Sequence, residues 1–395
     1  MKLVKVQTEN GLINTAVPSA VAAKFVPGEY IWSHSVKENL EQAFATGSGR
    51  IACRLLNKLL HRSGFEQIKL RTMTDLVERD GLEYHESAVA WGQKTLSEFG
   101  WDFETGQPTV TARIDECTSL PELQKQNENG RKVSEQRKEE IDNAVAAINK
   151  DRQKEFQIDA ANPSLYDIEA DESKVVMISL DGVGTKRQKD SRPKEKQDEP
   201  FFKKDSQEGP EDLRRAPDPK KRPKVETAVA HIESVEGKYM LTAKSMFELC
   251  KLILAFLLSH GLLRDRKLIF FLDGGRDIKQ ALDVVFKAIP HTIILDWFHL
   301  KKHCLELLSM GTKGGKKNRD QQYEIRRNLL RRLFAGNVDE AIKYLKELPD
   351  DYIKSRNIIV SLCEYLNRKR DAIACYALRN ALGYRISSNC VEKSY

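Results

Sequence analysis

Short apolar runs alternate with amphipathic segments through the second half of the chain. The runs at 173–184, 268–272 and 292–295 are rich in Val, Ile, Leu and Phe, a composition typical of strands that are covered on both faces. Two further β-rich runs within 225–244 meet at a Glu-Gly pair, which predicts a hairpin. The second half of the chain therefore contains the strands of a mixed sheet.

Helical patterns fill the intervals between these strands. A mostly apolar helix is predicted over 245–262, with Ser245 as its N-cap. Amphipathic helices are predicted after each of the last two strands, and residues 311–385 contain no strand-like run. The pattern predicts an α/β fold in which helices flank a mixed sheet, followed by a helical module.

The pattern of the N-terminal part predicts helices. Helical stretches at 72–80 and 85–99 flank Gly81, and two short helices around a glycine turn are typical of a helix-turn-helix. An ordinary helical hairpin has the same pattern, so DNA binding stays one of two interpretations. Residues 131–156 form a charged helix with few apolar anchors, which we interpret as a connector.

These patterns divide the chain into five segments. We expect a helical N-terminal domain at 1–130, a helical connector at 131–165, a catalytic-type α/β core at 166–297 with a mobile, charged and proline-containing loop at 185–224, a basic helical insertion at 298–385, and the start of a last helix at 386–395.

Composition narrows the class of protein. The 395 residues are 40% hydrophobic and 31% charged, and no apolar run is long enough for a membrane span or a secretory signal. Seven cysteines without a Cys-x-x-Cys pair suit reduced thiols, so we expect a cytoplasmic protein with no membrane partner. Residues 298–395 hold 20 basic and 11 acidic side chains, against 45 and 47 elsewhere. Such a basic segment favours a nucleic-acid partner, although a solvated helical surface has the same composition.

Two aspartates follow apolar strands and precede glycine. Asp181 and Asp273 each stand at the carboxyl end of a predicted strand, the edge where ligands bind in α/β sheets. Two neighbouring carboxylates repel each other unless a cation lies between them, and hard divalent ions such as Mg²⁺ or Mn²⁺ fit that role. A single Asp-Gly usually makes a turn, but two that close strands of one sheet favour a site.

The motifs around these acids resemble a known enzyme family. The segments "MISLDGVGTKRQK", "RPKVETAVAHIE", "FFLDGGRDI", "ILDWFHLKKH" and "GYRISSNCVE" resemble the active-site segments of DDE transposases encoded by bacterial insertion sequences. The resemblance covers roughly residues 170–395 and implies a ribonuclease-H-like catalytic domain with a helical insertion before the last catalytic helix. In this chain Ser387 and Asn389 replace the glycines that usually flank the serine of the last turn.

The resemblance assigns a catalytic triad of Asp181, Asp273 and Glu392, which would bind two Mg²⁺ (or Mn²⁺) ions. Two such ions can activate a water or a 3′-hydroxyl for in-line displacement at a phosphodiester, giving DNA cleavage and strand transfer. From the spacing alone, Asn389 to Glu392 is close to a capping box, in which the glutamate only closes its own helix. Family members continue well beyond this acid, so we interpret 386–395 as the truncated start of the catalytic helix.

Further residues are candidates for supporting roles. Asp296 and His299 form an Asp-x-x-His element that we expect near the triad, while His299, His303 and Cys304 leave a zinc site conceivable. The candidate DNA-binding side chains are Arg276, Lys316, Lys317, Arg326, Arg327 and Arg331.

Three functions therefore stay open at the level of sequence. The first is a nucleoid-associated bacterial transposase that acts on transposon ends and target DNA as a homo-oligomer. The second is a metal-dependent nuclease of the same fold. The third is a truncated remnant that only binds DNA. Transfer of a 3′-hydroxyl DNA end would separate the first from the second.

Overall fold

A computed structural model gives the arrangement of the chain. It describes residues 2–8, 11–17, 31–32, 53–54, 57, 70–115, 118–123, 135–167, 174–186 and 224–388. The chain divides into two compact units, one formed essentially by residues 1–90 and the other by residues 91–394. Most of the predicted loop, residues 187–223, lies outside the described residues, as does Glu392.

The first unit contains a small sheet that the sequence analysis did not predict. Strands β1 (Lys2–Thr8) and β2 (Gly11–Val17) pair antiparallel, and β3 (Ile31–Trp32) pairs parallel with β1. The expectation of a purely helical N-terminal domain is therefore wrong. Thr8 pairs with Gly11, so two residues, Glu9 and Asn10, connect the strands, and the Asn10-Gly11 pair at the start of β2 is the nearest turn signal in the sequence.

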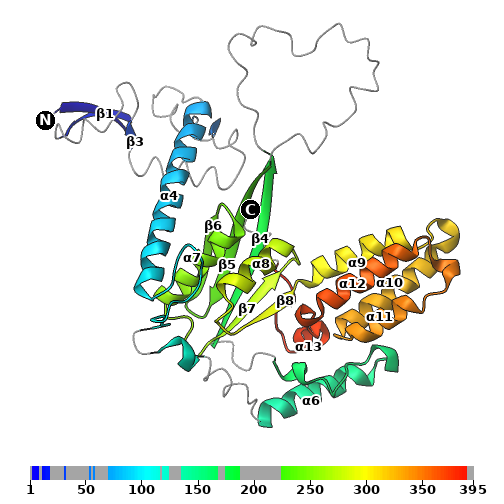
Figure 1. The fold of residues 1–395 in the computed structure, drawn as a ribbon. Coiled ribbons are helices and arrows are strands. Elements are labelled where there is room, and N and C mark those ends of the chain that lie inside the picture. The colour runs from blue at the N-terminus through cyan, green and yellow to red at the C-terminus, as the bar shows by residue number, and fades with distance from the viewer. Residues whose placement is uncertain are drawn as a thin grey trace, which may run out of the picture. The chain divides into compact units, whose positions relative to one another are not determined.

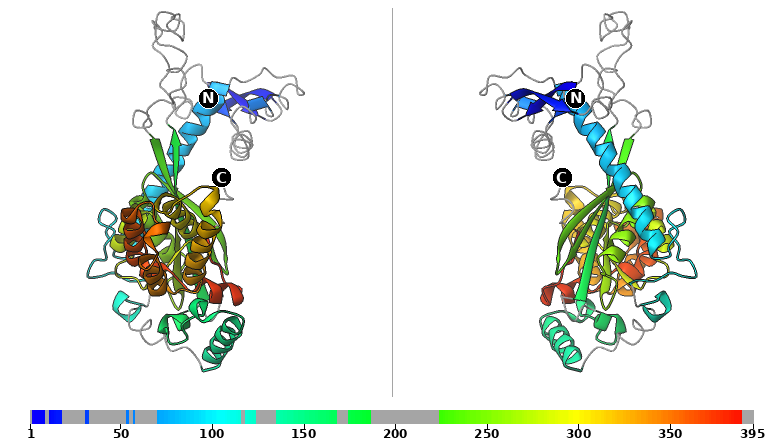
Figure 2. Two further views of the ribbon diagram at one scale, coloured as in Figure 1. Left: turned by 90° about the vertical axis from the view of Figure 1, so that its right-hand side faces the viewer. Right: turned by 90° about the vertical axis from the view of Figure 1, so that its left-hand side faces the viewer.

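Helix α4 (Leu70–Glu98) replaces the two helices predicted around Gly81. It runs unbroken for 29 residues (Figure 2). Gly81 is exposed within it, and a Cβ at this position would meet nothing within 4 Å. A glycine in a helix interior costs only about 1 kcal/mol relative to alanine, and the strong helix formers around it outweigh that cost. The helix-turn-helix prediction is wrong at this point in the chain.

The second unit is built on a five-stranded mixed sheet, as predicted. Its strands are β4 (Val175–Lys186), β5 (Lys224–Ser234), β6 (Gly237–Ala243), β7 (Lys267–Leu272) and β8 (His291–Leu295). They lie in the order β6-β5-β4-β7-β8. The predicted hairpin joins β5 to β6, and β4, β7 and β8 run parallel to one another. The α/β architecture is confirmed.

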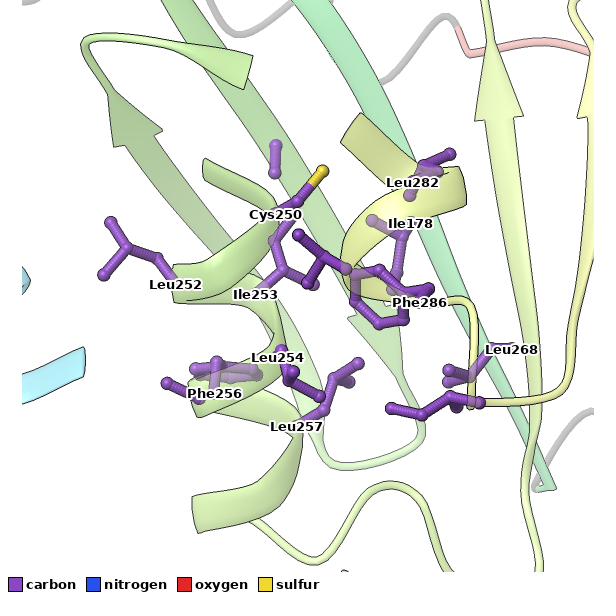
Figure 3. Close-up of a cluster of buried hydrophobic side chains, with 14 of the residues drawn as sticks. Ile178, Cys250, Leu252, Ile253, Leu254, Phe256, Leu257, Leu268, Leu282 and Phe286 are labelled. Atoms are coloured by element: carbon purple, nitrogen blue, oxygen red, sulfur yellow. The ribbon is translucent and has the colours of Figure 1, made fainter. Parts of the chain in front are cut away.

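One face of this sheet packs against α7 (Met246–Ser259) and α8 (Arg276–Val285). Ser245 caps α7 as predicted, because its hydroxyl accepts a hydrogen bond from the backbone N–H of Glu248 at 3.2 Å. Figure 3 shows the resulting core, in which Ile178 and Leu268 of the strands meet the apolar faces of both helices. Alternate residues of β4 and β7 face this layer.

The opposite face is covered by a helical module whose helices lie side by side (Figure 1). Its elements are α9 (Trp297–Gly311), η7 (Lys316–Asn318), α10 (Arg319–Phe334), α11 (Val338–Lys346), η8 (Asp350–Tyr352), α12 (Arg356–Arg368), η9 (Arg370–Ala372) and α13 (Tyr376–Ala381). No strand occurs between residues 311 and 385, as predicted. Val175, Ile269 and Phe271 of the sheet pack into this layer.

The predicted connector is helical at α6 (Glu135–Lys150), which is followed by η1 (Lys154–Phe156) and η2 (Pro163–Asp167). Ile141 and Val145 of α6 pack against Leu378 of α13, so this helix is attached to the module by a small apolar cluster. Within the described parts of the chain, no helix combines the length and apolarity needed to cross a membrane.

Candidate functional site

Asp273 and Asp296 follow the ends of β7 and β8, whereas Asp181 lies inside β4, just beyond its last residue paired with β7. The prediction that Asp181 ends its strand is wrong, because β4 continues to Lys186 beside β5. Leu180 of β4 pairs with Leu272 of β7, and Leu272 pairs with Leu295 of β8. Asp181, Asp273 and Asp296 directly follow these three residues, so all three lie at one edge of the sheet. The backbone N–H of Asp296 donates to the Leu272 carbonyl at 2.7 Å, which extends the ladder to this point. The first two aspartates therefore each follow the last residues through which the neighbouring strands β4 and β7 pair.

Alternation along the strands gives the face on which Asp181 lies. Ile178 and Leu180 belong to the core beneath α7 and α8, so Ser179 and Asp181 lie on the face covered by the helical module. Leu272 also faces the α7–α8 layer, and Asp273 is the next residue. Both carboxylates are partly exposed. The two acids thus share an edge of the sheet and remain accessible to a ligand.

The Asp-Gly pairs fix each carboxylate locally. Oδ1 of Asp181 accepts from the backbone N–H of Gly182, and Oδ1 of Asp273 accepts from that of Gly275, each at 2.7 Å. Gly274, between Asp273 and Gly275, has a φ of +94°, a conformation that L side chains rarely adopt. Glycine is therefore required by the backbone at Gly274, whereas a Cβ at Gly182 would meet nothing within 4 Å.

Helix α12 holds the loop that follows Asp273. The Nζ of Lys369 donates to the Gly274 carbonyl at 2.8 Å. A Cβ on Gly274 would lie 3.4 Å from the hydroxyl of Tyr365. Burial raises the pKa of Tyr365, and the nearby Cys304 and Asp273 raise it further. The tyrosine therefore stays a neutral hydrogen-bonding group beside Asp273, supplied by the helical module.

Asp296 has a different role from the other two aspartates. It is 1% exposed and caps α9, with Oδ1 accepting from the backbone N–H of His299 at 2.9 Å. Its Oδ2 accepts from both the backbone N–H and the hydroxyl of Ser388, the latter at 2.9 Å. The backbone N–H of Trp297 also donates to the Ile386 carbonyl at 3.0 Å. Asp296 therefore ties residues 386–388 to the sheet edge, four residues before Glu392 in the sequence.

The electrostatics of Asp296 agree with this arrangement. Burial alone would raise the pKa of its carboxyl group, but the hydrogen bonds from His299 and Ser388 outweigh burial and lower the pKa below the usual 3.8. Nδ1 of His299 lies 3.3 Å from Oδ1 of Asp296. The carboxylate is thus ionised at neutral pH and occupied by donors from the protein itself, which makes it a structural anchor.

The first two acids have the chemistry of ligands for a divalent cation. Aspartate oxygens from adjacent strands are hard ligands of the kind that Mg²⁺ and Mn²⁺ prefer. Among the residues that the structure describes, no group of three or more His, Cys, Asp or Glu side chains forms a metal site. The third predicted ligand, Glu392, lies outside the described residues, so its alternative as a helix cap stays open as well.

The structure gives no support to zinc at His299, His303 and Cys304. Cys304 is fully buried in the apolar cluster of the module, and burial raises the pKa of its thiol to about 12. A thiol with so high a pKa is a poor metal ligand at neutral pH. The ring of His303 packs against Tyr365 with a centroid distance of 4.3 Å. These neighbouring residues therefore serve packing.

A cavity of about 640 Å³ opens beside the acids. Gly182, Asp273 and Gly275 line it together with Lys244 and Phe247 from the start of α7. This volume lies within the range of small-molecule and substrate sites. One predicted catalytic acid therefore borders a hollow that could admit part of a substrate.

The candidate DNA-binding residues occupy separate places. Lys316 and Lys317 are exposed in η7, ahead of α10. Arg327 and Arg331 are exposed one turn apart on α10, and Arg327 pairs with Glu324 at 3.0 Å. Two further candidates are Arg326, which is half-buried on α10, and Arg276, the first residue of α8. The cations therefore form no single cluster.

Three residues near the site were missed from the sequence. Ser388 was noted only as part of an irregular turn, although a serine near an asparagine is a recognisable backbone-binding residue. Tyr365 and Lys369 lie in a helical pattern with no local signal, since their role depends on tertiary contact with Gly274.

Comparisons with protein-family models, curated proteins and solved structures gave no match for this chain.

Proposed function

We propose that the chain is a DDE transposase with a ribonuclease-H-like catalytic domain. The observation that supports this most directly is that Asp181 and Asp273 each follow the last pair, Leu180 with Leu272, of the parallel strands β4 and β7. In chain order these are the first and fourth strands of the sheet, as expected for that fold. The motif resemblance at both acids points to the same function.

In this proposal Asp181 and Asp273 supply carboxylate oxygens to two Mg²⁺ or Mn²⁺ ions, and Glu392 supplies a third ligand. Bound ions of this kind stabilise the attacking and leaving oxygens of an in-line phosphodiester displacement. The carboxylates fix where the ions bind, and the hydrogen bonds from Gly182 and Gly275 keep each carboxylate oriented. No residue of the chain needs to become a covalent nucleophile.

Asp296 acts in this proposal as a positioning residue. Its carboxylate holds Ser388, and the N–H of the neighbouring Trp297 holds the Ile386 carbonyl, so residues 386–388 are fixed at the sheet edge, four residues before Glu392 in the sequence. The side chain of His299 remains partly exposed beside it and is a candidate contact for DNA. The helical module thus delivers the third acid and a basic surface together.

Substitution of Asp273 tests the proposal. We expect Asp273→Ala to abolish Mg²⁺-dependent cleavage and strand transfer of a DNA duplex, since one ligand of both steps is lost. The matched control is Asp283→Ala, which removes an exposed acid from α8 and should leave both activities unchanged. Products are resolved on a denaturing gel, with a 3′-hydroxyl DNA end as the transfer substrate.

The same assay discriminates between the alternatives. Cleavage without joining of the 3′ end would favour a metal-dependent nuclease that uses the same acids. Cleavage that survives Asp273→Ala would show that the site assignment is wrong. Specific DNA binding without any cleavage in Mg²⁺ or Mn²⁺ would reduce the function to DNA recognition.

A further inference from the structure

A second cavity, of about 640 Å³, has a lining that includes neither Asp181 nor Asp273. It is bounded by residues 151–156 of the connector, by the first turns of α9 and by the second half of α10. None of the three predicted triad residues lines it. Its size is that of a pocket for one small ligand of nucleotide dimensions.

Positive charge dominates the walls of this cavity. Arg152, Lys301, Arg327 and Arg331 line it, against one acidic side chain, Asp151. Lys301, Arg327 and Arg331 are exposed, so their charged ends can reach a ligand at the mouth. Arginine and lysine together are the side chains that bind phosphate groups most strongly. The rim is therefore suited to an anion, and to phosphate in particular.

Aromatic rings form the apolar part of the same cavity. Phe156, Trp297 and Phe334 line it. Trp297 is fixed in place, with its ring centroid 4.9 Å from that of Phe334 and 5.0 Å from that of Tyr376. The guanidinium of Arg331 lies 5.3 Å from the centre of the Phe156 ring, which holds a cation beside the aromatic surface. Trp297 and Phe156 are largely buried, at 9% and 6% exposed, so the half-buried Phe334 offers most of the ring surface that a planar ring system can contact.

We propose that this cavity binds a nucleotide, with its phosphate among Lys301, Arg327 and Arg331 and its base against the aromatic wall. Neither feature alone requires a nucleotide, but a cationic rim next to an aromatic wall matches a ligand that joins a planar base to a phosphate. A free nucleotide and a nucleotide unit of single-stranded DNA share this chemistry. The proposal goes beyond strand cleavage and does not depend on it.

Equilibrium binding to the full chain tests the site with three probes: ATP without divalent metal, a short single-stranded oligodeoxynucleotide and pyrophosphate. We expect saturable binding of ATP or of the oligonucleotide, and binding of pyrophosphate at least about tenfold weaker because it lacks a base. Binding of ATP identifies the free nucleotide as a ligand, and binding of the oligonucleotide alone identifies DNA. Failure of both nucleotide probes to bind overturns the proposal, as does equal affinity for pyrophosphate.

Variants locate the bound probe. Lys301→Gln and Arg331→Gln should each raise Kd by about tenfold, the effect of losing one charge-assisted hydrogen bond. Lys343→Gln removes the same charge from an exposed position on α11 that does not line the cavity, so it should change Kd by less than about twofold. An equal effect of the control would show that only long-range charge is involved and would overturn the site.

The tryptophan gives a direct optical readout. Binding of a base against Trp297 should quench its fluorescence, and Trp297→Phe should remove that change in emission. Unaltered quenching in Trp297→Phe would place the ligand elsewhere. Asp273→Ala should bind both nucleotide probes as the wild type does, so loss of nucleotide binding and loss of strand cleavage are separately observable.

Discussion

At the scale of single residues, three aspartates at one sheet edge have unlike surroundings. Asp181 and Asp273 are partly exposed and each receives one backbone hydrogen bond from a nearby glycine. Asp296 is buried and receives its hydrogen bonds from His299 and Ser388. A buried carboxylate is tolerated only when such donors surround it. The sheet edge thus combines two partly exposed acids with one buried acid committed to the fold.

Replacement of Asp296 by asparagine tests the structural role. Asp296→Asn keeps the size of the side chain but removes the charge that accepts from Ser388, so we expect a loss of about 2 kcal/mol in the free energy of unfolding at neutral pH. Ser388→Ala removes only the hydroxyl donor and should cost about 1 kcal/mol. The double variant should lose less than the sum of the two, because both changes break one interaction. Denaturant unfolding of the wild type, the two single variants and the double variant measures these changes in the free energy of unfolding.

The pH dependence of stability checks the same carboxylate. The pKa of Asp296 is lower in the folded chain than its usual 3.8, so its ionised form stabilises the fold above about pH 4 and this contribution is lost as pH falls through the folded pKa. The stability difference between wild type and Asp296→Asn should therefore be largest near neutrality and shrink on acidification. A difference that stays constant with pH would contradict the role of the charge.

The roles of these aspartates could be predicted from the sequence only in part. The position after an apolar run was sufficient to place Asp273 and Asp296 at strand ends, because these strands end where their apolar pattern ends. It failed for Asp181, because β4 continues to Lys186 through its pairing with β5. The sequence could not show that Asp296 faces Ser388, which lies 92 residues away in the chain. A contact of that kind depends on how the helical module folds back over the sheet, and the local pattern does not encode it.

At the scale of elements, two glycines of α4 have opposite roles. Gly81 lies in the exposed middle of the helix, whereas Gly100 ends it with a φ of +76°. The backbone N–H groups of Gly100 and Trp101 donate to the carbonyls of Ser97 and Leu96, the hydrogen-bond pattern of a helix that closes in a left-handed glycine. A glycine thus marks the end of a helix only where the backbone adopts a positive φ, as it does at Gly100.

Alanine at position 81 distinguishes one long helix from two short ones. In a continuous helix Gly81→Ala should raise the free energy of unfolding by about 1 kcal/mol, since alanine is the better helix former and meets no neighbour. Gly100→Ala should be destabilising, because its Cβ would lie 2.7 Å from the carbonyl oxygen of Thr111. Thermal unfolding followed by circular dichroism measures both. A loss of stability in Gly81→Ala would instead indicate a turn at this position.

The strands and helices of the α/β unit were predictable because local and tertiary preferences agree there. Ser245 caps α7, apolar runs form β7 and β8, and the Glu236-Gly237 pair leads into β6, each close to its predicted bounds. The prediction for the N-terminal part failed for two local reasons. The Asn10-Gly11 pair at the start of β2 was passed over, and the Asp80-Gly81 pair was given the weight of a turn although the helical pattern continues on both sides of it.

At the scale of the whole molecule, the proposed function separates DNA binding from catalysis. The acids lie at the edge of the sheet, whereas the excess of basic residues lies in the chain after residue 298. Binding through Lys and Arg releases counterions from DNA, so affinity falls steeply with salt regardless of the state of the acids. Loss of basic residues from the helical module should therefore weaken DNA binding, whereas loss of an acid at the sheet edge should abolish DNA cleavage.

Salt titration of DNA binding tests this separation. The double change Lys316→Gln and Lys317→Gln removes two exposed cations ahead of α10. If both contact phosphates, the slope of log affinity for duplex DNA against log salt should become shallower by about two. The double change Lys343→Gln and Lys346→Gln removes the same charge from exposed positions on α11 and should leave the slope unchanged.

Asp273→Ala should bind DNA at least as well as wild type while failing to cleave it. Equal slopes for wild type and the Lys316 and Lys317 double variant would show that DNA binds elsewhere on the molecule.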